Sequence, residues 1–591
     1  MNRFLAVAAS ALLMMLIPAA ASSAAEILCV DARNTTGTET GTTQRPFTTI
    51  QAALDAAATG DTVKVAQGTY AENLVIDNKA VELLGGYAGG TTQAYAGNTA
   101  GDFATQNPTA SVTTINGAND APTIQLLYTD ASGTVIDGFT IRGGSRGIEF
   151  DTALTFPHIG DTTISRNTFE DNGIAEYERV GGGLFVDGDN NVIEDNIFRN
   201  NVSGRGAGAA FFGEDNVFQR NLVESNLGYA DHAGGLYQGG TATISDNIVR
   251  GNRIGEDIGY GWGGGIVVLG DATLTRNVWT GNYAPGIGGA VFVDDGATAT
   301  LDHELIYGNS AHRGAAVYVD GYSDNIASHV QIIHCTIAGN TADEQDDGNA
   351  VYVEQNSTVT LKNSIAWGNG GDDFAADGTS TITATYTLSE EVIAGTGNLV
   401  MDPLFADAGG GDFHLRSTAG RFDPAKGAGA FVMDGVNSPA IDAADPASPF
   451  GSEPAPNGGR ANLGAYGNTD EASKSGGGIV EGEPDGEGAV ETYHSADTSG
   501  DGAISLSELL RVIQFYNQGG LYCAALPEDS EDGFVAGTGA DHSCTPHDSD
   551  YKPTNWMVSL AELLRLIQLY NALSYTECPD ANTEDGFCLG S

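Results

Sequence analysis

A short motif that ends in asparagine recurs along the middle of the chain at a nearly constant interval. Each copy has an apolar residue, two variable positions and an asparagine, as in Phe169-Glu-Asp-Asn172. Successive asparagines are separated by 29, 25, 26, 30, 27 and 31 residues, and they are Asn172, Asn201, Asn226, Asn252, Asn282, Asn309 and Asn340. Periods in this range indicate a solenoid in which each repeat forms one turn of the chain.

The composition of each repeat favours strands over helices. A repeat contains short β-prone runs, such as Leu184–Val186 and Val192–Ile193, separated by Gly, Asn and Asp. None contains the roughly twelve residues of amphipathic period that a helical repeat requires. We therefore predict a mainly β fold, a parallel β-solenoid whose coils must stack because no coil buries its apolar face alone. The asparagines should form a ladder, because buried amides must be hydrogen-bonded and equivalent amides in stacked coils can pair.

A second motif, two glycines followed by aliphatic or aromatic residues, recurs in step with the asparagines. Its copies begin at Gly182, Gly234, Gly264 and Gly288. This alternation resembles the repeats of the polymorphic outer-membrane protein family, and the segments Pro46–Asn73, Ser438–Asp442 and Pro456–Gly467 resemble the first and last coils of the pectin-lyase-like superfamily. The resemblance implies a right-handed parallel β-helix over residues 26–470. It specifies activity poorly, because one scaffold hosts many functions.

The two ends of the chain differ in composition from the repeats. Residues 1–25 have the features of a signal peptide: Arg3, an apolar run and a small-residue cleavage site. Residues 471–489 are rich in Gly, Glu, Ser and Pro and predict a flexible linker before a small module at 490–591. We expect a monomer that is secreted or held at a bacterial cell surface and that does not span the membrane.

The charge of the chain limits its partners. The formal net charge is −52, from 77 acidic and 25 basic side chains. Nucleic acid is excluded as a partner, because binding it depends on cationic contacts to phosphate. An acidic polysaccharide would be repelled at long range unless calcium bridged it to the protein. The alternative interpretation of the charge is solubility in a salty exterior.

The C-terminal module is a duplication. The segment Ile504–Asn517 returns as Val558–Asn571, 54 positions later, and both copies predict an amphipathic helix. Four cysteines lie here, and in a small exported domain they predict two disulfides. Four cysteines allow three connectivities, between which the sequence does not choose; pairing within each repeat is our working hypothesis for Cys523, Cys544, Cys578 and Cys588.

The first copy begins with a candidate calcium loop. Oxygen-bearing side chains stand at positions 1, 3, 5, 9 and 12, Gly502 stands at position 6, and a backbone carbonyl is available at position 7. The alternative is a helix-capping box formed by Ser505 and Glu508, which is compatible with calcium. The segment that begins at Asp548 lacks the glycine and the aspartate spacing. The predicted calcium ligands are Asp497, Ser499, Asp501, Ala503, Ser505 and Glu508.

A duplicated loop-and-helix unit after a linker resembles the dockerin family of attachment modules and the related EF-hand. The resemblance implies calcium binding and attachment to a cell-surface protein. The chain departs from that family in two ways: its repeats are farther apart, and they carry cysteine-bearing insertions.

Carboxylates follow several strand-like runs of the repeats. If these positions are equivalent, the side chains form an acidic stripe along the stack, either as a solvated ladder of turns or as a groove for calcium or a cationic sugar. The predicted members are Asp187, Glu214, Asp271, Asp294, Asp320 and Glu354.

No catalytic motif is present. A lyase on this scaffold would need calcium and a Lys or Arg base, and the basic residues near the stripe, Arg313, Lys362 and His312, form no recognisable signature. The sequence favours a non-catalytic role in binding or adhesion to an extracellular polysaccharide or a cell-surface protein. The alternatives are a polysaccharide lyase or hydrolase of the pectin-lyase-like type and a purely structural envelope protein.

Overall fold

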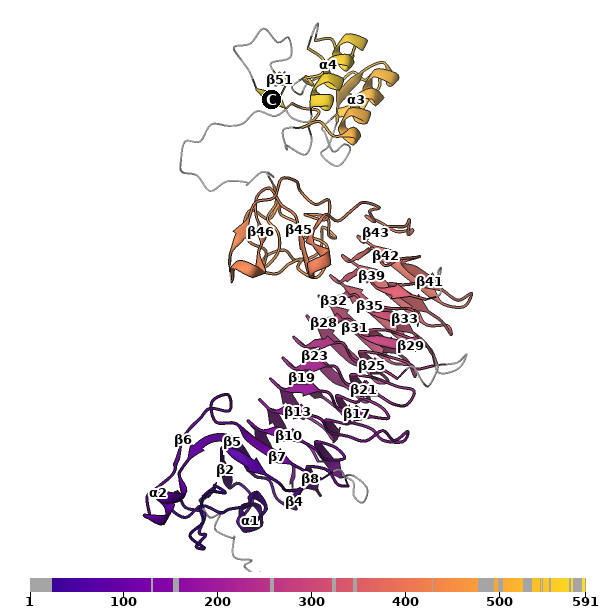
Figure 1. Ribbon diagram of the computed structural model, residues 1–591. Coiled ribbons are helices and arrows are strands. Elements are labelled where there is room, and N and C mark those ends of the chain that lie inside the picture. The colour runs from indigo at the N-terminus through magenta and orange to yellow at the C-terminus, as the bar shows by residue number, and fades with distance from the viewer. Residues whose placement is uncertain are drawn as a thin grey trace, which may run out of the picture. The chain divides into compact units, whose positions relative to one another are not determined.

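The structure of the protein is a computed structural model (Figure 1). The chain divides into two compact units, Met1–Thr243 and Ile244–Ser591. Most of the expected signal peptide and of the expected linker lies outside the described residues. The structure describes residues 24–118, 120–128, 131–151, 159–255, 260–321, 326–343, 348–427, 429–476, 494–497, 503–524, 534–542, 544, 546–551, 554–572, 575–577 and 587–589.

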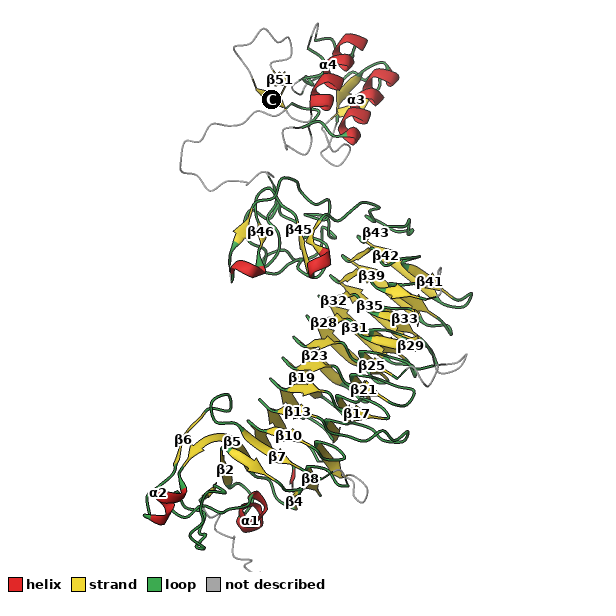
Figure 2. Ribbon diagram, viewed as in Figure 1, coloured by secondary structure: helices red, strands yellow, loops and turns green. Residues whose placement is uncertain are grey.

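Both units contain coils with the same order of short strands (Figure 2). A full coil contributes one strand to each of three parallel sheets, which we call A, B and C in chain order, and several coils add a short strand of a sheet D between B and C. Burial alternates along a strand: in Val192-Ile193-Glu194 only the middle side chain is buried. The strands therefore enclose an apolar interior and present every second side chain outward.

The N-terminal end of the first unit also contains two short helices and an antiparallel strand. The helices are α1 (Ile50–Ala56) and α2 (Thr92–Ala96), and β6 (Asp102–Gln106) pairs with β5. Sheet A contains β1 (Ile27–Val30), β2 (Thr62–Ala66), β5 (Glu82–Gly89), β9 (Val135–Asp137), β12 (Thr163–Ser165), β15 (Val192–Glu194) and β19 (Asn216–Gln219). Sheet B contains β3 (Gly68–Tyr70), β7 (Thr113–Asn116), β10 (Thr140–Arg142), β13 (Thr168–Glu170), β16 (Ile197–Arg199) and β20 (Leu222–Glu224). Sheet C contains β4 (Leu74–Asp77), β8 (Ile124–Leu127), β11 (Ile148–Asp151), β14 (Leu184–Asp187), β18 (Ala209–Phe212) and β22 (Leu236–Gln238), and sheet D contains β17 (Val202–Ser203) and β21 (Leu227–Gly228).

The second unit repeats this plan, and β23 (Ala242–Ser245) spans the point in the sequence where the units divide. Sheet A contains β27 (Ala272–Thr275), β31 (Thr298–Asp302), β35 (His329–Ile333), β39 (Thr358–Lys362) and β42 (Thr381–Thr385). Sheet B contains β24 (Ile248–Arg250), β28 (Val278–Thr280), β32 (Leu305–Tyr307), β36 (Thr336–Ala338), β40 (Ile365–Trp367) and β43 (Leu388–Ser389). Sheet C contains β26 (Ile266–Val268), β30 (Val291–Val293), β34 (Val317–Val319), β38 (Val351–Val353) and β41 (Phe374–Ala376), and sheet D contains β25 (Arg253–Ile254), β29 (Tyr283–Ile287), β33 (Ser310–Arg313) and β37 (Thr341–Ala342).

The predicted asparagine ladder is confirmed within each unit. Asn201 lies in its middle in the first unit: its Nδ2 donates to Asn226 Oδ1 (3.0 Å), and its Oδ1 accepts from Asn172 Nδ2 (3.1 Å). The same bonds join Asn282 to Asn309 in the second unit. All these side chains are buried. Each amide therefore forms hydrogen bonds with the backbone and the side chain of a neighbouring coil. The stacking of coils alone explains the asparagines.

A second ladder, not anticipated from the sequence, runs five residues before the first. In the first unit it consists of Asn167, Asn196 and Asn221. In the second unit Asn247 bonds Asn277, and the next position is Glu304 in place of asparagine. This carboxyl group is fully buried and accepts from Asn277 N (3.1 Å), Asn277 Nδ2 (3.0 Å) and the Trp279 indole N–H. Burial raises the pKa of Glu304 to about 8, so below that pH the protonated acid takes the place of an amide.

The described residues of 400–476 add no coil but pack onto sheet B of the second unit, and we call them the cap. The cap contains two antiparallel pairs and two short 3-10 helices: β44 (Phe405–Asp407) with β45 (Asp412–Leu415), β46 (Arg421–Phe422) with β47 (Phe431–Val432), η3 (Ala408–Gly410) and η4 (Pro424–Lys426). Gly464 N donates to Asn363 O (2.9 Å) and Ala465 N donates to Thr336 Oγ1 (3.0 Å). A shared apolar core that includes Leu305, Ile365, Phe413 and Leu463 completes the contact.

The C-terminal module contains two helices of equal length. These are α3 (Leu506–Gln518) and α4 (Leu560–Ala572), and each is followed by an antiparallel pair, β48 (Leu521–Cys523) with β49 (Phe534–Ala536) and β50 (Tyr575–Glu577) with β51 (Phe587–Leu589). Side chains from both repeats form one core, including Val512, Phe515, Leu566 and Leu569. Among the described residues, no helix is both long and apolar enough to cross a membrane.

Candidate functional site: cavities over sheet B

The largest of the cavities described here lies over sheet B of the first unit, and we call it the Arg166 cavity. Its volume is about 570 Å³. One wall is the segment from Gln106 to Thr113, and the floor is formed by outward side chains of β10, β13 and β16, including Thr140, Thr168 and Ile197. The lining therefore mixes hydroxyl groups with apolar surface and with the charged groups of Arg166 and Asp195.

Arg166 is held in this cavity by a hydrogen-bonded network. Its guanidinium donates to Asp137 Oδ1 from Nε (2.8 Å) and to Asp137 Oδ2 from Nη2 (2.5 Å), and Nη2 also donates to Gln106 Oε1 (2.8 Å). Gln106 Nε2 donates in turn to Asp137 Oδ2 (2.6 Å). The hydrogen bond to Asp137 raises the pKa of Arg166. The side chain remains half exposed, so it can bind a ligand but is unsuited to act as a base.

Two further cavities lie between sheet B and the cap in the second unit. The larger, about 470 Å³, is bounded by β28, β32, β36, β40 and the cap residues Phe405 and Phe413, and we call it the aromatic cavity. The smaller, about 260 Å³, is lined by Arg276, His303, Tyr466 and acidic residues of the cap, and we call it the polar cavity.

His303 of the polar cavity joins the solenoid to the cap. Its Nδ1 lies 2.7 Å from Asp302 Oδ1, and its Nε2 lies 2.8 Å from the carbonyl oxygen of Gly467. The ring therefore lies between a carboxylate of the solenoid and a backbone carbonyl of the cap. The stacked His334 ring, 5.0 Å away, is buried, and burial followed by the charge of His303 lowers the pKa of His334 to about 4.

The predicted acidic stripe exists over only part of its expected length. Val293, Val319 and Val353 are paired in register, and the residues that follow them, Asp294, Asp320 and Glu354, occupy equivalent positions in consecutive coils. Burial, followed by the charge of Glu354, raises the pKa of Asp320. Among the described residues, no group of three acidic, His or Cys side chains could hold one metal ion.

The other three predicted members form no continuous column of carboxylates. Asp187 is paired in register with Phe212, and Glu214 N instead donates to Asp189 Oδ1 (2.7 Å). Asp271 precedes β27 of sheet A and accepts from Thr298 N (2.9 Å). Neighbouring coils therefore carry different residue types at equivalent positions, so a carboxylate after one strand does not imply a carboxylate after the next.

A member of the stripe that the sequence analysis missed is Asp377. It follows Ala376, which is paired with Val353, and therefore continues the column beyond Glu354. Burial opposes ionisation there, but hydrogen bonds from Gln355 N and from the Ser380 and Thr379 groups outweigh it and lower the pKa of Asp377 to about 2. The signal in the sequence was only the strand-like Phe374-Ala-Ala before an aspartate.

None of the three basic residues considered for catalysis lines the described cavities. Lys362 Nζ forms an ion pair with Asp445 of the cap (2.6 Å). His312 and Arg313 lie on β33 of sheet D, which follows sheet B in the coil. The structure therefore does not bring these three groups together around any of the three cavities described above.

The N-terminus of α3 shows the capping box that was the alternative to calcium. Ser505 Oγ accepts from Glu508 N (3.3 Å), and Ser505 N donates to Glu508 Oε2 (2.7 Å). Ser559 and Glu562 form the same two bonds at α4. Asp497 and Glu508 are both buried, and Asp497 Oδ2 accepts from Tyr575 Oη (2.5 Å). Ala503 lies among the described residues, whereas Ser499 and Asp501 lie outside them.

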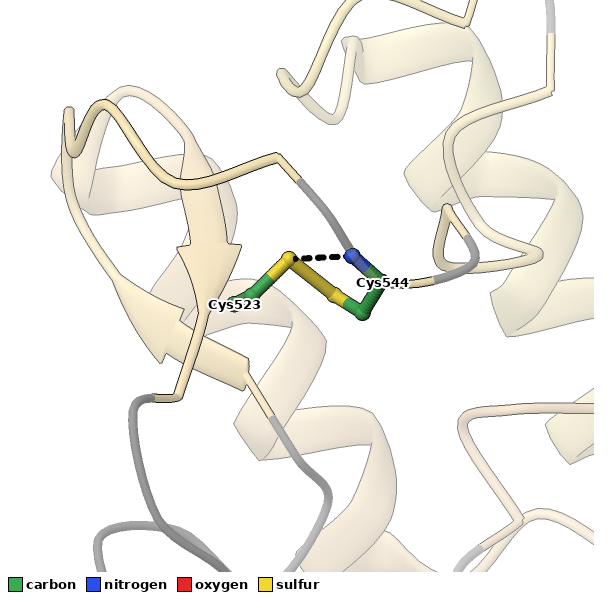
Figure 3. The surroundings of a disulfide bond; sticks show 2 residues. All are labelled: Cys523 and Cys544. Carbon is green, nitrogen blue, oxygen red and sulfur yellow. Dashed lines mark hydrogen bonds between the residues drawn. A yellow bond between two sulfur atoms is a disulfide. The ribbon is translucent and has the colours of Figure 1, made fainter.

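One predicted disulfide is observed within the first repeat of the module. Cys523 and Cys544 are bonded, and Cys544 N also donates to Cys523 Sγ (2.9 Å; Figure 3). Cys588 is disulfide-bonded as well, and Cys578 lies outside the described residues. Cys29 and Cys335 are free and buried.

Comparison with known proteins identifies the solenoid. Residues 126–303 and 265–396 match the family model described as a right handed beta helix region. The solenoid is a right-handed β-helix. This confirms the fold class predicted for the repeats, and the glycine and asparagine motifs are therefore coil-forming features of the β-helix. No curated protein matches the chain.

Solved structures with partial similarity to this β-helix protein have low identity and low TM-scores. Pectate lyase Pel9A is 13% identical, with 75% of this chain and 96% of that chain covered and a TM-score of 0.33. The complex of XylC with xylose is 10% identical, with 64% and 87% covered and a TM-score of 0.30. An alginate lyase from Paenibacillus sp. str. FPU-7 is 14% identical, with 57% and 95% covered and a TM-score of 0.27.

Proposed function

We propose that this β-helix protein binds an extracellular polysaccharide on the outer face of sheet B, without catalysing its cleavage. The observation that carries the proposal is the Arg166 cavity, which combines threonine hydroxyls, apolar surface and a charged network held in place by its own hydrogen bonds. Ligand sites typically combine apolar lining with a few fixed polar groups. A sugar chain presents hydroxyl groups and apolar ring faces, which match this lining.

A binding role fits the electrostatics better than catalysis does. A lyase base must give up its proton near neutral pH, whereas the bond to Asp137 raises the pKa of Arg166. The second candidate, a polysaccharide lyase or hydrolase, is favoured by one observation. Arg166 and Asp195 follow strands of consecutive coils and line one cavity, and Asp137 of the preceding coil binds Arg166. Incubation with neutral and uronic-acid polysaccharides, with and without calcium, separates the two. Formation of unsaturated or reducing products would overturn the binding role.

The first prediction concerns Arg166. Replacing Arg166 by alanine is expected to weaken binding of the polysaccharide from this panel that the parent protein binds. The expected loss is about tenfold in affinity, or about 1.4 kcal/mol, because a fixed hydrogen-bond donor is lost. Isothermal titration calorimetry with the full chain measures this effect. Arg205→Ala is the matched control, because Arg205 is also paired with an aspartate, Asp231, but does not line the cavity. Equal losses in both variants would contradict the assignment.

We further propose that the C-terminal module binds calcium and attaches the β-helix to a cell-surface protein. Support comes from the buried carboxylates of Asp497 and Glu508 at the start of α3, because buried carboxylates favour a nearby cation. The capping box bonds Ser505 N to Oε2 of Glu508, and this bond is compatible with a role of the same carboxylate as a metal ligand. Ser499 and Asp501 would complete the oxygen set.

The second prediction tests this loop. Asp501→Ala is expected to lower calcium affinity at least tenfold, because it removes one of the few charged ligands of a hard cation. Calcium titration of the full chain, followed by calorimetry, measures the change. Asp541→Asn removes an exposed carboxylate outside the loop and should leave the affinity unchanged. Unchanged affinity in Asp501→Ala would refute the loop.

A further inference from the structure

The aromatic cavity differs from the rest of this acidic protein in its chemistry. Among the described residues, none that lines it carries a charge, although the chain has a net charge of −52. Its walls include the half-buried rings of Tyr307 and Trp367 on sheet B and the ring of Phe413 in the cap. An uncharged site on a strongly anionic chain selects a ligand by shape and ring contact, not by ion pairing.

The register of sheet B sets the dimensions of this cavity. Tyr307, Ala338 and Trp367 are paired in register, so a small side chain lies between two aromatic ones. Strands in a sheet are about 4.8 Å apart, so the two rings project from strands about 9.6 Å apart. This interval leaves room for one sugar ring above Ala338. Phe413 lies 4.9 Å from the Tyr307 ring and closes one side.

Glycines keep the floor of the cavity open. Gly339 and Gly368 follow Ala338 and Trp367 in left-handed turns (φ 63° and 71°), and a Cβ at either would meet nothing within 4 Å. The space above them is therefore not filled by neighbouring side chains. Thr280 supplies a hydroxyl group at the edge.

We propose that the aromatic cavity is a subsite for one neutral sugar ring of the polysaccharide, held between Tyr307 and Trp367; this rests on the proposed function. The C–H faces of a pyranose ring are apolar and stack on aromatic rings, while its hydroxyl groups point to the edge. A uronic acid would lose hydration of its carboxylate here without gaining a cationic partner, which is unfavourable. The cavity therefore selects neutral sugars over acidic ones.

The test compares neutral and acidic oligosaccharides on the full chain. Cellohexaose and xylohexaose are the neutral probes and hexagalacturonate is the acidic probe, with affinity measured by calorimetry and tryptophan fluorescence. Trp367→Ala should weaken binding of a neutral probe at least tenfold, Trp367→Phe should stay within about threefold, and neither should change the acidic probe. Melting curves confirm that both variants are folded.

Several outcomes would overturn the proposal. Neutral probes that bind the parent and Trp367→Ala equally would place the neutral site elsewhere, while leaving polysaccharide binding intact. If Trp367→Ala no longer bound the acidic probe, or if the cavity bound a free aromatic compound in place of sugars, the cavity would have another ligand. If neither class of oligosaccharide binds the parent, the proposed function fails together with the subsite.

Discussion

Replacing Glu304 by alanine is expected to lower the free energy of unfolding of the β-helix by about 3–5 kcal/mol, because each of several buried donors left without an acceptor costs about 1–3 kcal/mol. Glu304 accepts from Asn277 N, Asn277 Nδ2 and the Trp279 indole in a fully buried position. Alanine leaves these donors without this acceptor and also leaves a cavity. Urea denaturation followed by circular dichroism measures the change.

The stability of the parent should also depend on pH through this residue. Its folded-state pKa is about 8, above the value of about 4.3 for an exposed glutamate. The favourable contribution of the protonated form is therefore complete below pH ~4, and it is lost as pH rises toward 8. The raised pKa of Asp320 changes stability with pH in the same direction. The contribution of Glu304 is therefore the difference between the pH dependence of the parent and that of a variant without Glu304.

The control for Glu304 is a double substitution that restores the pattern of other coils. Trp279→Phe with Glu304→Asn places phenylalanine where the first unit has Phe169 and Phe198, and asparagine in the second ladder. This variant should recover most of the stability lost in Glu304→Ala and lack the pH-dependent component. Glu304→Asn alone should be less stable, because the Trp279 N–H loses its acceptor. Equal stability of the single and double variants would contradict the coupling.

The second large effect is expected for Asn201→Ala, at about 3 kcal/mol of destabilisation, since several buried groups lose partners at once. Asn201 Nδ2 donates to Phe169 O and Asn226 Oδ1, and its Oδ1 accepts from the backbone and side chain of Asn172. One substitution therefore disturbs the coils on both sides.

The neighbouring residue provides a control for Asn201. Asn200 is exposed and has φ 54°, so Asn200→Gly keeps the turn and removes only an exposed amide. Its effect should stay within about 0.5 kcal/mol. Urea denaturation of both variants under the same conditions measures the difference. Similar losses at positions 200 and 201 would show that the ladder contributes little.

The asparagine period, the Gly-Gly pairs and the short β-prone runs were sufficient to predict a mainly β parallel solenoid and its ladder of amides. These features are local, and each coil repeats the same backbone requirement, so a sequence pattern reports them directly. The duplicated helices of the module were predicted for the same reason, because their amphipathic pattern is local. The pairing of Cys523 with Cys544 was a working hypothesis, since four cysteines allow three connectivities.

The tertiary structure decided what the repeat could not. Register determined that Asp294, Asp320 and Glu354 occupy equivalent positions in consecutive coils, whereas Asp187 is paired with Phe212 and Asp271 precedes a strand of sheet A. The cap folds onto sheet B through contacts between residues more than a hundred positions apart, such as Ala465 with Thr336. No short sequence pattern therefore predicts the cavities between the cap and sheet B. The sequence by itself determined the stack of coils, and only the folded chain determined which face of that stack was left hollow, because long-range packing places the cap.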